Sequence, residues 1–139
     1  MISCGPEIKL SAKPIILVVD DDLNILAVLE ARLSSIDYRV LTASGAEEAI
    51  ELLKNRPVDL MITDVKMPGM GGMDLFSAAH EIRPGLPVMF LTAYGTIPDA
   101  VKALKAGAID YLTKPFNGLE LISKVQEVLK NSAPKSLPA

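Results

Sequence analysis

The residues of this chain that could take part in catalysis or bind a ligand stand at the ends of short apolar runs. These residues are four carboxylates, one hydroxyl and one ammonium: Asp20, Asp21, Asp22, Asp64, Thr92 and Lys114. The three consecutive aspartates are the least expected of them, since like charges about 4 Å apart cost up to about 4 kcal/mol per pair at an effective dielectric of about 20. Either a bound cation offsets this repulsion or the three side chains point apart.

Carboxylates that converge on one point favour a cation. An all-oxygen donor set with room for water suits Mg²⁺, which takes one or two carboxylates together with a phosphate oxygen. Thr92 and Lys114 would then contact the other side of an anion. A metal, a carboxylate, a hydroxyl and an ammonium together are typical of a phosphoryl-transfer site. Asp64 is the candidate nucleophile because it stands alone, and the crowded aspartates would hold the metal.

These residues can meet only if the apolar runs are strands of one sheet. The runs are Ile15–Val19, Arg39–Ala43, Val58–Thr63, Pro87–Leu91 and Ala108–Leu112. Several are apolar nearly throughout, which suits strands that are buried on both faces. Segments of helical periodicity lie between the runs and after the last one. The least regular of them runs from about Gly72 to Ile82, and Thr96 is a candidate cap for the helix up to Ala106.

Five strands that alternate with five helices predict an α/β fold. We expect a doubly wound, flavodoxin-like sheet of five parallel strands in the order 2-1-3-4-5. Ligands bind such sheets beyond the carboxyl ends of the strands, at the point where the strand order reverses. That point lies between the first and third strands, whose ends carry the aspartate triplet and Asp64.

Composition sets the remaining limits. The chain has 139 residues, 50% of them hydrophobic and 22% charged, which predicts one globular domain. A net charge of −3 gives no electrostatic footprint for nucleic acid. No apolar run is long enough for a membrane span, and the single cysteine fits the cytoplasm. We expect a flexible tail over 1–12, the domain over 13–131, and a linker or tail over 132–139.

From about residue 13 to residue 130, the chain resembles the receiver domains of two-component response regulators. The family pattern is an acidic pair after strand one, Asp at the end of strand three, Thr or Ser after strand four, and Lys-Pro after strand five. This chain has all of these as Asp20-Asp21, Asp64, Thr92 and Lys114-Pro115, together with "MPGMGG". The segment "LTAYGTIPDAVKALKAGAIDYLTKPF" is most similar to NtrC-type receivers, which precede an ATPase and a DNA-binding domain. We interpret the chain as a receiver cut from a longer protein, with a free-standing receiver as the alternative.

The resemblance assigns the phosphoryl chemistry to one end of the sheet. It implies that Asp64 is the phosphorylation site, that Asp21 binds Mg²⁺ directly, and that Asp20 assists through water. The backbone carbonyl of Lys66 would be the third protein ligand. Asp22 then falls outside the family's acidic pair, so we expect it to cap the first helix.

The resemblance also assigns the residues that would hold and report the phosphoryl group. Thr92 and the backbone of Ala93 would hold it, and Lys114 would pair with it. Tyr111 occupies the position of the family's aromatic switch residue, and the Lys114–Pro115 bond is expected to be cis.

The function implied is that of a phospho-accepting switch rather than an enzyme with a separate substrate. The donor would be a histidine kinase or a phosphotransfer protein, and the chain would catalyse only its own phosphorylation and dephosphorylation. The altered surface would control an output, with transcription favoured. A homodimer through the fourth helix, fifth strand and fifth helix is plausible, whereas this segment is expected to bind neither nucleic acid nor membrane.

Two other classes compete for the same residues. A phosphohydrolase of the haloacid dehalogenase type would use Asp20 as nucleophile and Asp22 as acid and base. Such enzymes need a further acidic pair after the lysine, and here only Glu120 and Glu127 follow, on an expected helix. A flavin-binding electron carrier of the same fold class is excluded, because its first loop must hold a phosphate and this one carries three carboxylates.

Overall fold

The computed structural model describes residues 13–136, and within them the chain forms one five-stranded sheet. The strands are β1 (Ile15–Val19), β2 (Arg39–Ala43), β3 (Leu60–Asp64), β4 (Val88–Thr92) and β5 (Asp110–Thr113). They lie in the order β2-β1-β3-β4-β5, and every neighbouring pair is parallel. The predicted doubly wound sheet and its strand order are confirmed.

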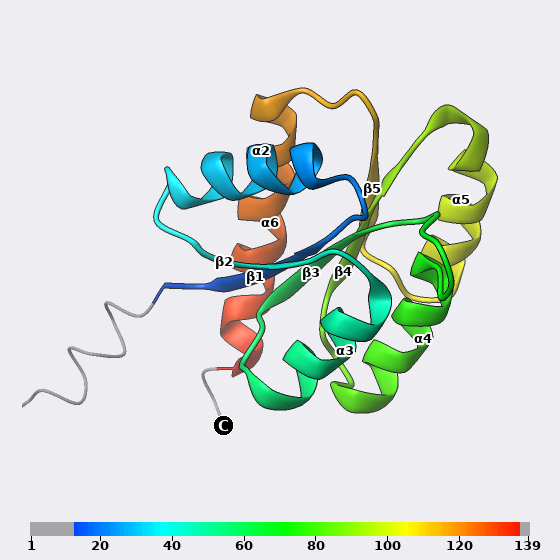
Figure 1. Cartoon of the computed structure of the whole chain (residues 1–139). Helices are drawn as coiled ribbons and strands as arrows, with labels where there is room; N and C mark the ends of the chain where they lie inside the picture. The colour runs from blue at the N-terminus through cyan, green and yellow to red at the C-terminus, as the bar shows by residue number, and fades with distance from the viewer. Residues whose placement is uncertain (1–12, 137–139) are drawn as a thin grey trace, which may run out of the picture.

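Five α-helices and one short 3₁₀ turn connect and flank the strands (Figure 1). They are α2 (Leu23–Ser34), α3 (Ala46–Asn55), α4 (Gly72–Ile82), η1 (Tyr94–Thr96), α5 (Ile97–Lys105) and α6 (Gly118–Ser136). The last helix extends into the segment that the sequence predicts as a linker. The predicted flexible tail over 1–12 lies outside the described residues.

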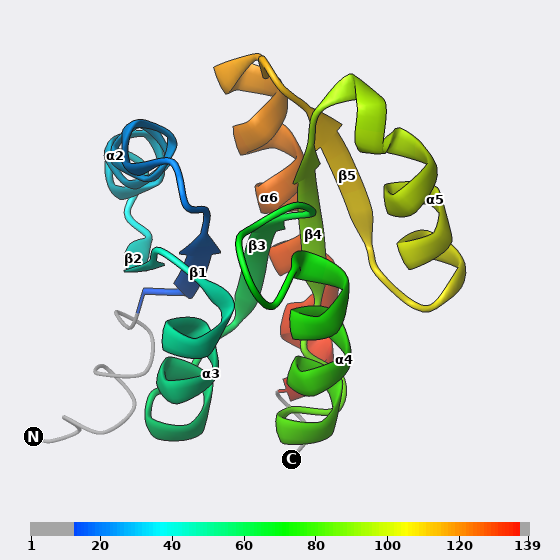
Figure 2. The ribbon, with the colours of Figure 1, turned by 45° about the vertical axis from the view of Figure 1, so that its right-hand side comes forward.

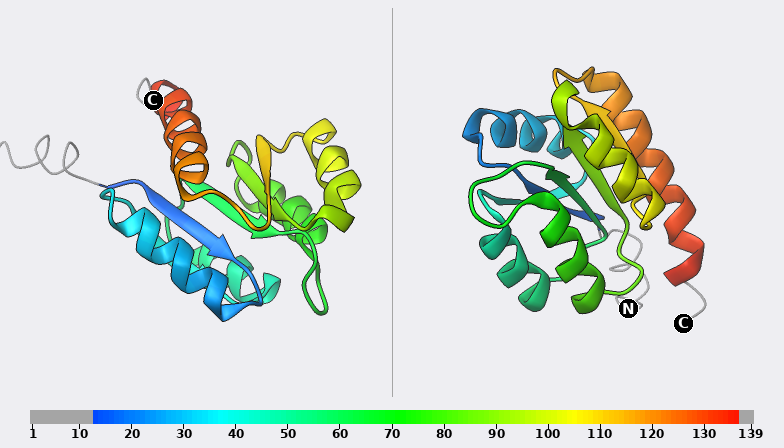
Figure 3. Two further views of the ribbon diagram at one scale, coloured as in Figure 1. Left: turned by 90° about the horizontal axis from the view of Figure 1, so that it is seen from above. Right: turned by 90° about the vertical axis from the view of Figure 1, so that its right-hand side faces the viewer.

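The helices cover the two faces of the sheet, which explains why the inner strands are apolar on both sides (Figures 1 and 3). On one face, Leu29 of α2 and Leu121 of α6 are fully buried against strand residues such as Ile62. On the other face, Leu53 of α3 and Leu75 of α4 are equally buried. Each such leucine contributes about 1.5–3 kcal/mol by leaving water.

Helices α3 and α4 lie side by side (Figures 1 and 2), and an arginine joins their ends. The guanidinium of Arg83, just past α4, donates to the carbonyls of Leu53 at 2.9 Å and Arg56 at 2.6 Å. These carbonyls stand at the C-terminal end of α3, where no helical partner is available and where the helix dipole favours a cation. Arg83 thus fixes α4 relative to α3.

The carboxyl ends of the strands point to one rim of the molecule, as the strand arrows in Figure 2 show. Register places Asp64 of β3 beside Leu91 of β4, and Thr92 of β4 beside Thr113 of β5. The residues singled out from the sequence therefore emerge at the same edge of the sheet.

Candidate functional site

Three carboxylates converge at the rim where the strand order reverses. Each of Asp20, Asp21 and Asp64 offers one oxygen, and these oxygens lie within 4.8 Å of one another. Asp20 has no exposed surface, the Asp64 side chain is 13% exposed, and Asp21 is exposed. The predicted convergence of the first and third strand ends is thus present.

Lys114 lies between two of these carboxylates. Its Nζ is 2.7 Å from Asp20 Oδ2 and 3.1 Å from Asp64 Oδ2. The other oxygen of Asp20 accepts the backbone N–H of Asp22 at 2.9 Å, so both Asp20 oxygens have a donor. The Lys114–Pro115 peptide bond is cis, as the resemblance implied.

The charges at this rim do not balance. Burial raises the pKa of the Asp20 carboxyl above its ordinary value and outweighs the lowering by Lys114 and the Asp22 N–H. Burial alone would lower the pKa of Lys114, but its hydrogen bonds to Asp20 and Asp64 raise it. The two directions are compatible, because one ammonium serves two carboxylates, and Asp20 also feels the Asp64 charge.

The donor set fits a hard divalent cation. All three candidate ligands are carboxylate oxygens, which Mg²⁺ prefers, and the cluster holds more negative charge than Lys114 neutralises. Asp21, the exposed member, leaves one side of the cluster open to solvent. Lys66 follows Asp64 by two residues, and its role as a carbonyl ligand stays a prediction.

The aspartate triplet is accommodated because its side chains have different surroundings. Asp20 is buried against Lys114, and Asp21 is exposed beside Asp64. Asp22 precedes α2, and its Oδ1 accepts the backbone N–H groups of Asn24 at 2.9 Å and Ile25 at 3.4 Å. The predicted helix cap is therefore confirmed.

Thr92 ends β4 as a fully buried hydroxyl. Its Oγ1 lies 3.1 Å from the Ala93 carbonyl oxygen, to which it can donate, and it also contacts Thr96 Oγ1. The prediction that Thr96 caps the following helix is wrong as regards its side chain. Thr96 occupies the N-cap position of α5, but its hydroxyl makes no capping bond and is directed to Thr92 and Ala93 instead.

Tyr111 lies on the same face of the sheet as Thr92. It pairs in register with Phe90, two residues before Thr92, and residues two apart in a strand share a face. The Tyr111 side chain is partly buried against the core on the side of α3, α4 and α5. Its position permits the predicted coupling to Thr92, and its switch role stays a prediction.

A glycine that the sequence reading left without a role supports the backbone of Asp64. A Cβ built on Gly72 would overlap the Asp64 carbonyl oxygen and lie 3.0 Å from Val65 Cα. Only glycine permits so close an approach of α4 to the end of β3. The "MPGMGG" segment contains this residue, but a close approach between two backbones leaves no separate signal in one sequence.

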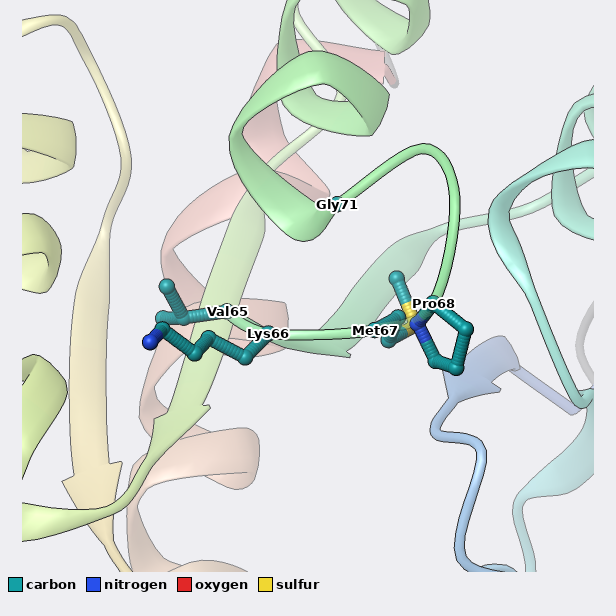
Figure 4. A pocket seen from close by; sticks show the side chains of 5 residues that line it. All are labelled: Val65, Lys66, Met67, Pro68 and Gly71. Carbon is teal, nitrogen blue, oxygen red and sulfur yellow. The ribbon is translucent and has the colours of Figure 1, made fainter.

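The loop between Asp64 and α4 borders an open pocket of about 450 Å³, lined by Val65, Lys66, Met67, Pro68 and Gly71 (Figure 4). In Figure 4 the Lys66 side chain points away from Met67 and Pro68. The Lys66 side chain is exposed.

The fold and the site together define a class. The protein is a doubly wound α/β domain with a cluster of three carboxylates, whose oxygens could hold a metal ion, and a lysine at the carboxyl rim of its sheet. The sequence model of the family 'response regulator receiver domain' matches residues 16–126, and the chain belongs to that family. It is therefore a phosphoryl-accepting signalling switch, and the phosphohydrolase alternative is not supported.

Relatives and solved structures agree with this membership. The transcriptional regulatory protein GlrR of Escherichia coli is 43% identical over 126 residues, which are 90% of this chain and 28% of that protein. A CheY-like receiver domain protein from Methanospirillum hungatei superimposes with a TM-score of 0.84 at 34% identity, covering 90% of this chain and 100% of the other. The NtrX receiver domain from Brucella abortus gives a TM-score of 0.80 at 32% identity, covering 83% and 98%. This chain thus spans under a third of the curated regulator.

Within the described part of the chain, no helix is both long and apolar enough to cross a membrane.

Proposed function

We propose that Asp64 accepts the phosphoryl group, from a histidine kinase or a phosphotransfer protein. The observation that carries this is the contact of Lys114 with both Asp20 and Asp64, while only Asp64 of that pair reaches solvent. Asp20 is fully buried with both oxygens engaged, so it is not available to a donor. One Asp64 oxygen lies 3.1 Å from the Lys114 ammonium, and the side of Asp64 towards the exposed Asp21 is open.

The transfer forms one bond and breaks another. An oxygen of the ionised Asp64 carboxylate attacks phosphorus and forms the O–P bond of an acyl phosphate. The P–N bond to the donor histidine breaks, and its electron pair stays on the ring nitrogen. With acetyl phosphate as donor, a P–O bond breaks and acetate leaves. Lys114 lies close enough to pair with the transferred group, and the chain itself is the acceptor.

Mg²⁺ would be held by the carboxylates of Asp20, Asp21 and Asp64 and by the backbone carbonyl of Lys66. When bound, the ion would offset the negative charge that builds up between Asp64 and the phosphoryl oxygens. Asp21 is the direct ligand in this proposal and Asp20 acts through water, in keeping with their exposed and buried positions.

Thr92 and Ala93 report the phosphoryl group to the rest of the domain. The Thr92 hydroxyl exchanges its bond to the Ala93 carbonyl for one to a phosphoryl oxygen, and the Ala93 backbone N–H contacts the same group. Tyr111 then moves into the space that Thr92 vacates, and α5 shifts with it. This is a population shift between two packings that a local charge biases.

The output is proposed to lie in a longer protein that acts in the cytoplasm and regulates transcription, because the relative GlrR is a transcriptional regulator of which this chain spans 28%. The face formed by α5, β5 and α6 is the proposed dimer surface, with Val101 and Ile109 exposed on it. Lys124 already pairs with Asp110 at 2.6 Å on this face, which leaves fewer free charges for a partner. This segment itself is not proposed to bind nucleic acid or membrane.

Labelling with acetyl phosphate and Mg²⁺, read by intact mass, tests the proposal. The parent should gain one phosphoryl group, Asp64→Asn none, and Asp21→Ala nearly none. Asp22→Asn is the matched control: it keeps a side-chain acceptor for the cap of α2 and should label like the parent. Normal labelling of Asp64→Asn would rule out Asp64 as the acceptor.

A further inference from the structure

Two buried threonines meet at the end of β4. Thr92 and Thr96 are 0% and 7% exposed, and their hydroxyl oxygens are in contact. Both hydroxyls also reach the Ala93 carbonyl oxygen, at 3.1 Å from Thr92 and 3.0 Å from Thr96. The proposed function requires the Thr92 hydroxyl to leave this cluster. The hydrogen bonds that hold it in the cluster therefore also set the equilibrium between the two conformations of the domain.

Thr96 departs from the usual behaviour of a threonine before a helix. At an N-cap position the side-chain oxygen normally accepts a backbone N–H of the first turn. Thr96 stands at that position with φ −112° and ψ 11° and makes no such bond. The η1 turn, closed by the Thr96 N–H on the Ala93 carbonyl at 3.0 Å, brings its hydroxyl back to Thr92 instead.

The hydrogen bonds of the cluster can be counted. Two hydroxyl protons are available, and each hydroxyl can also accept. Either hydroxyl can be the donor in the contact between Thr92 and Thr96. When Thr96 donates to the Ala93 carbonyl, its oxygen can accept the proton of Thr92. Without the Thr96 hydroxyl, Thr92 keeps only the Ala93 carbonyl as a partner. That carbonyl remains satisfied by the Thr96 N–H, so no buried polar group is orphaned.

We infer that Thr96 is a positioning residue that retains the Thr92 hydroxyl away from the phosphoryl position in the unmodified protein. The inference rests on the proposed function and adds a second hydroxyl to its regulation. Removal of one such bond changes an equilibrium by about 2- to 10-fold. A ligand that requires the displaced Thr92 then binds more tightly by the same factor, because less of the protein is held in the wrong state.

The test is the affinity of the chain for beryllofluoride, a phosphoryl mimic, in the presence of Mg²⁺, measured by calorimetry. Thr96→Val keeps the branched shape and removes the hydroxyl, and it should bind about 2- to 10-fold more tightly than the parent. Thr96→Ser keeps the hydroxyl and should bind like the parent. Thr42→Val makes the same change on β2, away from the cluster, and should leave the affinity unaltered.

A double-mutant cycle separates this role from a merely structural one. In a Thr92→Ala background, Thr96→Val should have no effect on the affinity, because the hydroxyl that it releases is absent. The Thr92 methyl resonance gives a second readout: in ligand-free Thr96→Val it should move towards its position in the beryllofluoride-bound parent. Unchanged or weaker binding by Thr96→Val, or a gain that persists without Thr92, overturns the inference.

Failure of the inference is distinguishable from failure of the proposed function. If the parent binds beryllofluoride and Asp64→Asn does not, the proposed function stands, and the Thr96 variants alone decide the inference. If the parent shows no binding that depends on Asp64, the proposed function fails and the inference falls with it.

Discussion

Lys114 and Asp20 form an ion pair of 2.7 Å although they are 94 residues apart in the sequence. Asp20 is fully buried, and the same ammonium lies 3.1 Å from Asp64. One side chain that follows β5 thus joins the ends of β1 and β3 across the rim. In the unmodified protein, Lys114 contacts two of the carboxylates at which Mg²⁺ and the phosphoryl group are proposed to bind.

Removal of the Lys114 charge should therefore destabilise the fold. Lys114→Met leaves Asp20 buried without its counter-charge, and because the lysine is partly exposed we expect a loss of about 1–3 kcal/mol in the free energy of unfolding. Urea unfolding in EDTA measures this, with Lys54→Met, an exposed lysine on α3, as the control. Added Mg²⁺ should reduce the loss. Equal stability of parent and variant in EDTA would show that the pair contributes nothing.

The Lys114–Asp20 contact also shows what one sequence cannot reveal. The strand order brings both residues to the rim, and the sequence predicted that convergence. The sequence analysis placed Lys114 against the anion and did not predict its ion pair with Asp20. A flexible lysine can reach several carboxylates at this rim, and burial decides which of them it contacts most closely. Asp20 is the carboxylate with no exposure to solvent.

Gly72→Ala should damage both stability and phosphorylation. Its Cβ would overlap the Asp64 carbonyl oxygen, which belongs to rigid backbone, so α4 and the end of β3 must move apart. Overpacking of this kind costs about 1–3 kcal/mol, and displaced Asp64 should label more slowly with acetyl phosphate.

Gly71→Ala is the matched control, because a Cβ there would lie 3.3 Å from the Val65 carbonyl oxygen and needs only a small adjustment. Urea unfolding and the labelling rate should place Gly71→Ala near the parent. If the two variants behave alike, the close approach at Gly72 is not what positions Asp64.

The stability of the fold should depend on pH in the alkaline range, because of the pair between Lys124 and Asp110. Its hydrogen bond to Asp110 raises the pKa of Lys124 above the ordinary value of 10.5. The stability that this pair contributes is fully present below pH 10.5 and is lost as the pH rises through the higher pKa of the folded state. For a partly exposed pair we expect only about 0.2–1 kcal/mol.

Unfolding of the parent and of Lys124→Met, at pH 9 and again above pH 11, measures this contribution. The parent should be the more stable at the lower pH, and the difference should shrink at the higher one. A difference that is the same at both pH values would assign the effect to packing of the lysine stem rather than to its charge.

The elements themselves were largely predictable. Three elements have the predicted bounds: the strands Ile15–Val19 and Arg39–Ala43 and the helix Gly72–Ile82. Short runs of β-forming residues and apolar residues at helical spacing can both be recognised directly in a sequence. The third strand begins at Leu60 rather than Val58, although Val58 is buried too, since burial alone does not distinguish a strand from the turn before it.

Contacts between loops were harder to predict. A threonine before a helix is a sound signal for a cap, yet the Thr96 hydroxyl turns back to Thr92. The spacing of four residues between the two threonines permits this contact. Only the path of the η1 turn, which is set by tertiary packing, decides between the cap and the contact.

The location of the acyl phosphate tests the central claim most directly. After treatment with acetyl phosphate and Mg²⁺, borohydride reduces an aspartyl phosphate to homoserine and leaves free carboxylates unchanged, so peptide mass spectrometry identifies the modified residue. The account predicts homoserine at Asp64 alone, and none when Mg²⁺ is removed by EDTA. Homoserine at Asp20, Asp21 or Asp22, with Asp64 unmodified, would contradict it.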